Sequence, residues 1–127
     1  MILNLTQHVA SAEQLAAGVV DLPTAERGLL IDRLTVDSLP TKQEIEARCA
    51  DIAQIAVHSG LGGDMDDPHP AQAMIGGAPW MMSALESALQ SQGIAAVYAF
   101  SVRESVEHSQ PDGSVRKVNV FRHAGFI

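Results

Sequence analysis

The sequence predicts a three-layer α/β domain with a mostly parallel sheet and a C-terminal β-hairpin, a single domain over residues 1–127. First, short apolar runs alternate with helical segments along the chain. Second, the run from Ile94 to Phe100 is apolar throughout, which is typical of a central parallel strand buried on both faces. Third, Pro-Asp-Gly at 111–113 separates two alternating runs, residues 102–109 and 114–121, which indicates a hairpin.

Four apolar runs are expected to form the parallel strands, and helical segments connect them. The expected strands are residues 1–5, 19–22, 73–75 and 94–100. The expected helices are residues 12–17, a segment from about 41 to 60, and residues 80–92. The second of these helices has the clearest start, because Thr41 and Glu44 have the spacing of a capping box. Residues 25–34 have only a partial apolar face, so their type stays open.

The segment 60–70 is rich in glycine, aspartate and proline and is predicted to be a loop. Asp64, Asp66 and His69 are of the residue types that ligate metals. Their spacing fits neither an EF-hand nor a zinc motif, and no second cluster completes the set. We therefore expect no metal site and no cofactor.

The net charge, the cysteine count and the lengths of the apolar runs exclude several classes of protein. A formal charge of -7 argues against binding long nucleic acid across an open surface, although a local positive pocket for a small anion remains compatible with it. Cys49 is the only cysteine, so no intrachain disulfide forms, and its place on an apolar stripe indicates a buried hydrophobe. No apolar run reaches the roughly 18 residues of a membrane span, so we expect a cytoplasmic protein without a membrane partner.

Polar residues and glycines follow three of the expected strands, at the point where each strand ends. They are Asn4, Thr6 and His8 after the first strand, Gly76 and Gly77 after the third, and Ser101, Arg103 and Glu104 after the fourth. If the strands are parallel, all three groups lie at the carboxyl edge of one sheet, where open α/β sheets bind ligands. A glycine pair at a helix start brings backbone N–H groups close to a phosphate, and arginine suits the same anion.

Each group also has a structural explanation. Gly76 and Gly77 fit a tight strand-to-helix turn, and Arg103 fits a surface ion pair with Glu104 or Glu107. Thr6 and His8 could cap the first helix, and His123 in the last strand is expected to be structural. The functional interpretation depends on the convergence of the three groups on one edge.

The two ends of the chain resemble a known family. Tyr98 to Glu104, the Asp112-Gly113 turn and the closing Phe121-Arg122-His123 resemble small CRISPR-associated Rossmann-like proteins of the ring-nuclease type, which are related to the CARF domains that sense cyclic oligoadenylates. The opening from Asn4 to His8, followed by Glu13-Gln14, is similar too. The similarity is poor between about residues 23 and 70, and Phe100-Ser101 occupies the place of two hydroxyl residues in that family.

The resemblance implies a homodimer that binds a cyclic oligoadenylate-type second messenger in antiviral defence. It also implies cleavage without metal, in which the 2′-hydroxyl of the ligand is the nucleophile and the protein aligns the phosphate. The expected catalytic residues are Thr6, His8, Ser101 and Arg103. The expected ligand-binding residues are Asn4, Gly76, Gly77, Ser101, Arg103 and Glu104.

Two other functions are compatible with the sequence. One is a non-enzymatic, phage- or defence-related protein-interaction module, in which the hairpin and a patch at Trp80-Met81-Met82 would contact the partner. The other is a nucleotide- or nucleoside-processing enzyme. The chain lacks a nucleophile elbow, a Walker loop and Gly-x-Gly-x-x-Gly, which disfavours hydrolysis of ATP and binding of dinucleotides.

Overall fold

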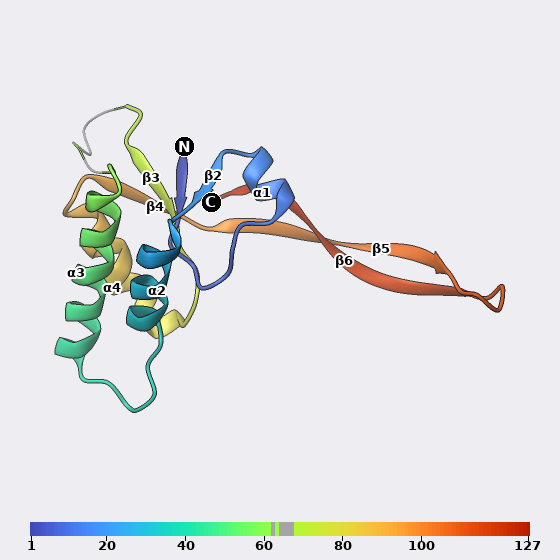
Figure 1. The fold of residues 1–127 in the computed structure, drawn as a ribbon, viewed down its shortest axis with the longest axis horizontal. Helices are drawn as coiled ribbons and strands as arrows, with labels where there is room; N and C mark the ends of the chain where they lie inside the picture. The colour runs from blue at the N-terminus through green and yellow to red at the C-terminus, as the bar shows by residue number, and fades with distance from the viewer. Residues whose placement is uncertain (62, 64–67) are drawn as a thin grey trace.

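The protein folds into a parallel sheet flanked by helices, from which a long antiparallel hairpin projects (Figure 1). The computed structural model describes residues 1–61, 63 and 68–127. The sheet contains β1 (Ile2–Asn4), β2 (Val19–Asp21), β3 (Ala71–Met74) and β4 (Ile94–Val97). The helices are α1 (Ala12–Ala16), α2 (Thr24–Leu34), α3 (Lys42–His58) and α4 (Pro79–Gln90), and the hairpin pairs β5 (Ala99–Ser109) with β6 (Val115–Phe126). The predicted fold class is confirmed.

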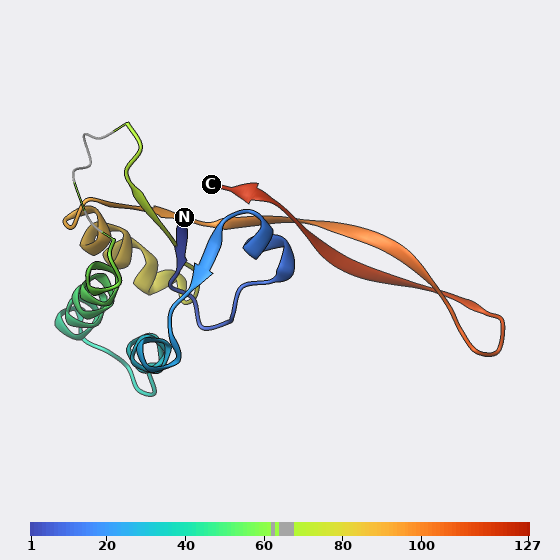
Figure 2. The ribbon, with the colours of Figure 1, turned by 45° about the horizontal axis from the view of Figure 1, so that its top comes forward.

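The strand order shows that successive strands are added first on one side of β1 and then on the other. All neighbours are parallel, and the order is β2-β1-β3-β4. The chain moves from β1 to one side to form β2, and then crosses to the other side of β1 to form β3 and β4. Because such crossovers are right-handed, α1 covers one face of the sheet and the later helices cover the opposite face. Figure 2 shows α2, α3 and α4 grouped together, with α1 set apart beside β2 and the hairpin.

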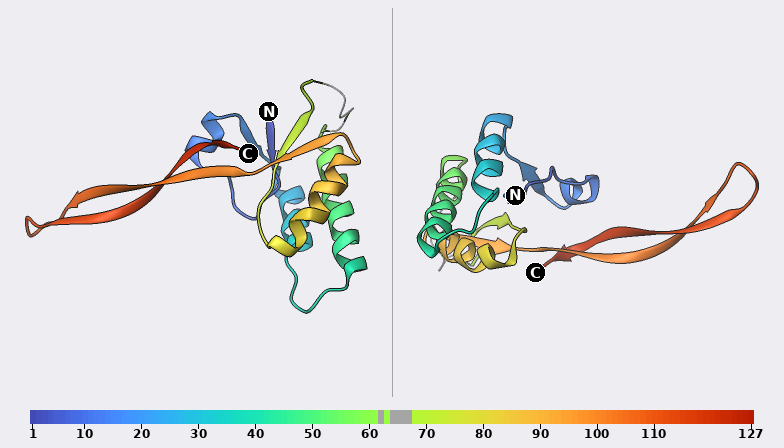
Figure 3. Two further views of the ribbon diagram at one scale, coloured as in Figure 1. Left: turned by 180° about the vertical axis from the view of Figure 1, so that it is seen from behind. Right: turned by 90° about the horizontal axis from the view of Figure 1, so that it is seen from below.

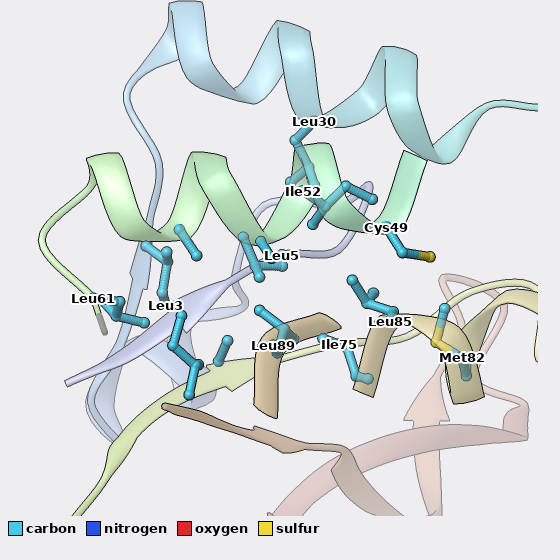
Figure 4. Close-up of a cluster of buried hydrophobic side chains, with 14 of the residues drawn as sticks. Leu3, Leu5, Leu30, Cys49, Ile52, Leu61, Ile75, Met82, Leu85 and Leu89 are labelled. Carbon is cyan, nitrogen blue, oxygen red and sulfur yellow. The ribbon is translucent and has the colours of Figure 1, made fainter. Parts of the chain in front are cut away.

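The main core lies between the sheet and the three longer helices (Figure 4). Leu3, Leu5 and Ile75 of the sheet side belong to one buried cluster with Ile52 of α3 and Leu85 of α4, and each is at most 3% exposed. Cys49 belongs to the same cluster, which confirms that it is a buried hydrophobe, and burial raises the pKa of its thiol. A second, smaller cluster covers the other face of the sheet, and its buried members are Ala10, Val19, Met74 and Val97.

Local signals explain where the helices begin. The Thr41 hydroxyl oxygen accepts a hydrogen bond from the Glu44 backbone N–H at 3.1 Å, so the predicted cap of α3 is confirmed. Ser11 caps α1 through a complete capping box with Gln14. The segment of open type is the helix α2, and its last turn packs near α3 through Leu34.

The fourth strand ends earlier than the apolar pattern predicts. β4 stops at Val97, and the next residue, Tyr98, exchanges two backbone hydrogen bonds with Ile127, at 2.9 and 2.8 Å. This pairing with the C-terminus diverts the chain out of the parallel sheet, and β5 begins at Ala99. The expected strand over 94–100 is therefore wrong at its end, and Phe100 is 49% exposed instead of buried on both faces.

The arm, which we define as residues 99–126, extends away from the remainder of the protein, which we call the body (Figures 1 and 3). Its strands pair from Ala99 opposite Phe126 to Ser109 opposite Val115, with an irregularity between Phe100 and Ser101. β6 continues to Phe126, five residues beyond the expected end at Phe121. Within the part of the chain that the structure describes, no helix is long and apolar enough to cross a membrane.

Candidate functional site

A cleft opens at the carboxyl ends of β1, β3 and β4. Its volume is about 480 Å³, and its walls are residues 6–9 and 14 after β1, residues 74–77 at the end of β3, and residues 98 and 99 after β4. It lies where the strand order reverses between β1 and β3. This is the topological switch point, at which open α/β sheets bind ligands because the loops of neighbouring strands separate there.

The loop after β1 is shaped by the buried side chain of Asn4. Its amide nitrogen donates to the His8 carbonyl oxygen at 2.8 Å and to Asp21 Oδ1 at 2.7 Å. Its amide oxygen accepts from the Thr6 backbone N–H at 2.9 Å and lies 2.7 Å from the Thr6 hydroxyl. Asp21 also accepts from the Ala10 N–H at 3.0 Å. Asn4 is fully buried and lies outside the cleft wall, so this expected ligand-binding residue instead positions the loop that carries Thr6 and His8.

Thr6 and His8, which the sequence places at the carboxyl edge of the sheet, both line the cleft. The structural alternative, that they cap the first helix, is wrong because Ser11 is the cap of α1. The Thr6 hydroxyl has its donor directed at Asn4 Oδ1 or at the His8 carbonyl oxygen 3.1 Å away, so its lone pairs remain for a ligand donor. The His8 side chain is exposed, and its imidazole can exchange a proton with a ligand.

Gly76 and Gly77 form the part of the wall that leads into α4. Gly77 has a φ of +144°, a conformation that favours glycine, and this lets the chain turn sharply from β3 into the helix. The first position of α4 is Pro79, and its N-cap, Ala78, supplies no side-chain acceptor. The first turn of α4 also has no acidic residue. The 12-residue helix α4 therefore begins two residues after Gly77 of the cleft wall, with neither a side-chain cap nor an acidic residue to neutralise its positive end.

Arg27 is a cation beside the cleft that sequence analysis did not single out. Its Nη2 donates to the carbonyl oxygen of Gln7, a residue of the cleft wall, at 3.2 Å. Its Nη1 is buried and makes no hydrogen bond within the described residues. Arg27 follows the second expected strand closely, and this position could have pointed to the carboxyl edge of the sheet. Because residues 25–34 were not predicted to be a helix or a strand, Arg27 could not be placed in the first turns of α2 at that edge.

Tyr98 closes the cleft on the side of β4. Its hydroxyl donates to the carboxylate of Glu86 on α4. Desolvation of the phenol and this hydrogen bond to Glu86 raise the pKa of Tyr98 to about 12. The phenol therefore stays protonated near neutral pH and acts as a donor anchored to α4.

Ser101, Arg103 and Glu104 lie on β5 of the arm and do not line the cleft. Glu104 pairs with Arg122 of the neighbouring strand, at 3.3 Å from Nε. Arg103 is exposed and makes no ion pair within the residues that the structure describes. The expectation that three strand ends share one edge thus holds for Thr6 and Gly76 and fails for Ser101, because the pairing of Tyr98 with the C-terminus carries the following residues into the arm.

Asp64 and Asp66 of the loop considered for metal lie outside the described residues. In the described part, no group of three or more histidine, cysteine or acidic side chains is close enough to hold a metal ion. His123 packs its ring against Phe126, with 4.8 Å between ring centroids.

The patch expected at the start of α4 is not a surface. Met81 and Met82 are 1% and 8% exposed and belong to the core, so only Trp80, which is 50% exposed, is available to a partner. Trp80 lines a second hollow of about 570 Å³ between α3 and α4.

Comparison with known proteins places the chain in one family. A family model described as Uncharacterized protein MJ1673 family matches residues 1–127. No curated protein and no solved structure matches the chain. This description names no activity, so the function is argued from the geometry of the cleft.

Proposed function

The chain belongs to the uncharacterized protein MJ1673 family, and we propose that it binds a phosphate-bearing ligand of the cyclic oligonucleotide class in the cleft. The observation that carries this proposal is the position of the glycine pair and the uncapped start of α4 at the switch point of the sheet. Backbone N–H groups at such a helix start hydrogen-bond phosphate oxygens, and the helix dipole favours the negative charge. Arg27, held against the cleft wall, adds a formal positive charge nearby.

The size of the cleft limits how much of the ligand it can enclose. About 480 Å³ is within the range of small-molecule sites, about 300–1,000 Å³, and suits one nucleotide unit better than a ring of several. The other units of a cyclic ligand would extend beyond Ala99 onto the base of the arm. Ser101 is two residues beyond Ala99 and Arg103 is four, so these two residues would reach the part of the ligand that lies outside the cleft.

Cleavage of such a ligand would use its own 2′-hydroxyl, as the family resemblance implies. Attack of that oxygen on the adjacent phosphorus forms a 2′,3′-cyclic phosphate and breaks the bond to the 5′-oxygen, which takes a proton from water and leaves as a 5′-hydroxyl group. His8 would take the proton of the 2′-hydroxyl, and the oxygen of Thr6 would accept a ligand hydrogen bond that fixes the ribose. In this scheme the backbone donors at Gly76 and Gly77 stabilise the charge that develops on the phosphate.

Titration calorimetry and thermal unfolding with cyclic tri-, tetra- and hexa-adenylate test the binding proposal. We expect at least one of these rings to bind and to raise the melting temperature, because a ligand that binds only the folded state stabilises it. Chromatography of the incubated ligand then tests for the 2′,3′-cyclic phosphate product. His8→Ala should retain binding and lose any cleavage. The absence of binding by all three rings would refute the proposed ligand class.

A non-enzymatic interaction module is the second candidate, and the arm is the observation that favours it. The arm contributes nothing to the main core and exposes most of its residues. A cleft that binds no anionic ligand, together with an arm that binds a partner, would favour this function.

A further inference from the structure

The two faces of the arm differ in chemistry. Cross-strand partners share a face, and the pairs Val102–Arg122, Glu104–Val120 and Val106–Val118 lie on the same side. Four valines therefore form an aliphatic strip, namely Val102, Val106, Val118 and Val120. The same face also carries Glu104, His108, Arg116 and Arg122. The opposite face contains mainly serine, asparagine and charged residues, with Val115 and Phe121 as its two large apolar side chains. Such alternation is typical of a sheet that packs on one side, yet among the described residues no other element covers the valine strip.

An isolated two-stranded hairpin is at best marginally stable in water, because it buries little apolar area and leaves both edges unpaired. The contacts of the arm with the body lie at its base, where the Glu13 carboxylate accepts from the His123 N–H at 3.2 Å and lies 3.8 Å from Arg122. The outer part of the arm, from about residue 103 to 121, has only its own two strands (Figure 3). It therefore has the properties of a sheet that is completed by another chain.

The backbone of β5 shows which groups are available on its free edge. At the turn, the Gln110 N–H donates to the Ser114 carbonyl oxygen at 2.7 Å, so the peptide groups of Gln110 face β6. Because peptide groups alternate in direction along a strand, every odd-numbered residue from 101 to 109 presents its N–H and C=O outward. These residues are Ser101, Arg103, Ser105, Glu107 and Ser109.

The charges distinguish the two edges. On β6 the outward-facing residues from 115 to 121 include one charge, Lys117, and no acidic residue, so two β6 edges could form no ion pair with each other. β5 contains charges of both signs, with Arg103 and Glu107 among its outward-facing residues. The charges therefore favour β5 as the edge that pairs with a copy of itself, because it alone of the two offers complementary outward-facing charges.

We propose that two copies of this chain associate through their β5 edges, antiparallel and centred on Ser105. In this register Ser105 faces Ser105 of the second copy, and Arg103 faces Glu107 of the second copy on both sides of the two-fold axis. All five outward-facing residues find partners, which no shifted register allows. The product is a four-stranded sheet, β6-β5-β5-β6, in which the valine strips of both arms lie on one continuous face.

This arrangement brings the tip of each arm to the base of the other. Ser109 lies opposite Ser101 of the second copy, so the turn at 110–113 lies beside the residues that follow the second copy's Ala99, which lines its cleft. The pairing depends on the arm alone and does not require that the cleft bind an anionic ligand. Failure of one proposal would leave the other intact.

A pair of proline variants tests the edge. Ser105→Pro removes an outward-facing N–H that the proposed interface uses, while the hydrogen bonds between β5 and β6 remain. Asn119→Pro, directly opposite on β6, makes the same change at the other edge and is the matched control. Light scattering coupled to size exclusion should give wild type and Asn119→Pro at twice the chain mass of 13.5 kDa, and Ser105→Pro at one chain mass. A monomeric wild type at every concentration, or equal dissociation by both prolines, would overturn the proposal.

Charge exchange tests the register. Arg103→Glu and Glu107→Arg should each weaken the dimer about tenfold or more, because like charges then face each other twice. The Arg103→Glu/Glu107→Arg double variant should restore it. A mixture of the two single variants should form a heterodimer, since every facing pair is then of opposite sign. Failure of the mixture to associate, with both variants shown to fold by circular dichroism, would exclude this register.

Discussion

The body and the arm are both built on β-strands, but different forces hold them. The four strands of the body are only three or four residues long, and their stability comes from the side chains of three helices packed on one face. The strands of the arm are 11 and 12 residues long and are supported mainly by their own ladder. Strand length therefore says little about stability in this protein, whereas burial of the strand residues decides it.

The largest expected effect distinguishes the two regions directly. Leu85 is fully buried between the helices and the sheet, so Leu85→Ala should lower the free energy of unfolding by about 3 kcal/mol or more through loss of packing and formation of a cavity. Val118→Ala on the arm should cost less than about 1 kcal/mol, since little apolar area is lost there. Urea denaturation followed by far-UV circular dichroism measures both. Similar costs would mean that the arm is part of the cooperative core.

The next effect compares two asparagines. Asn4→Ala should destabilise the body by about 2 kcal/mol, because it leaves the Thr6 N–H, the His8 carbonyl and the Asp21 carboxylate without their buried partner. Asn119→Ala on the exposed arm is the control and should change stability by less than about 0.5 kcal/mol. The same urea series measures the difference. A neutral Asn4→Ala would show that the loop before α1 does not depend on this network.

The third prediction compares cations in the two regions. Arg27→Ala should weaken binding of a cyclic adenylate by about 1.5–3 kcal/mol, the range for a hydrogen bond to a charged group. Arg27→Lys should recover part of this loss, since lysine keeps the charge without the planar fork. Arg103→Ala should have a smaller effect, limited to ligand that extends onto the arm, and Arg116→Ala near the tip should have none. Calorimetric titration of the four variants would contradict this order if Arg116→Ala lost as much affinity as Arg27→Ala.

The smallest expected effect concerns pH. Tyr98 is the only tyrosine, so its ionisation is visible without interference in the tyrosinate absorbance. Its pKa of about 12 in the folded state lies above the ordinary value of 10.0, so the stability it contributes is complete below about pH 10. That contribution is lost as the pH rises from about 10 to 12, because the unfolded chain ionises first. An absorbance midpoint near 10 in the folded protein would show that Tyr98 is solvated.

Local sequence patterns were sufficient to predict most of the body, although the type of α2 stayed open. Apolar periodicity, the cap at Thr41 and the glycines after the strands are local signals, and they located β1, β3, α3 and the cleft residues Thr6, His8 and Gly76. The end of β4 depends on the two hydrogen bonds between Tyr98 and Ile127, which are 29 positions apart in the sequence. A local sequence pattern cannot predict a contact between residues so far apart. Ser101 and Arg103, at the start of the predicted hairpin, were therefore expected at the sheet edge, although β5 carries both away from the cleft.

The misassigned patch at the start of α4 has a different cause. Composition indicated an apolar surface, but the rotation of the helix decides which side chains face the sheet, and it directs Met81 and Met82 into the core while Trp80 faces outward. The importance of Arg27 was equally hidden, since it follows from contact with Gln7, a residue 20 positions earlier. In both cases tertiary packing supplied the information.

The central claim is that the body is stable by itself, whereas the arm is stabilised by pairing with a second copy. Hydrogen exchange of the full chain at low and high protein concentration tests this claim most directly. The account predicts that amides of α3 and α4 are equally protected at both concentrations. It predicts that the outward-facing amides of Arg103, Ser105 and Glu107 exchange rapidly when dilute and become protected when concentrated. Rapid exchange of these three amides at every concentration, or protection that does not change with concentration, would contradict it.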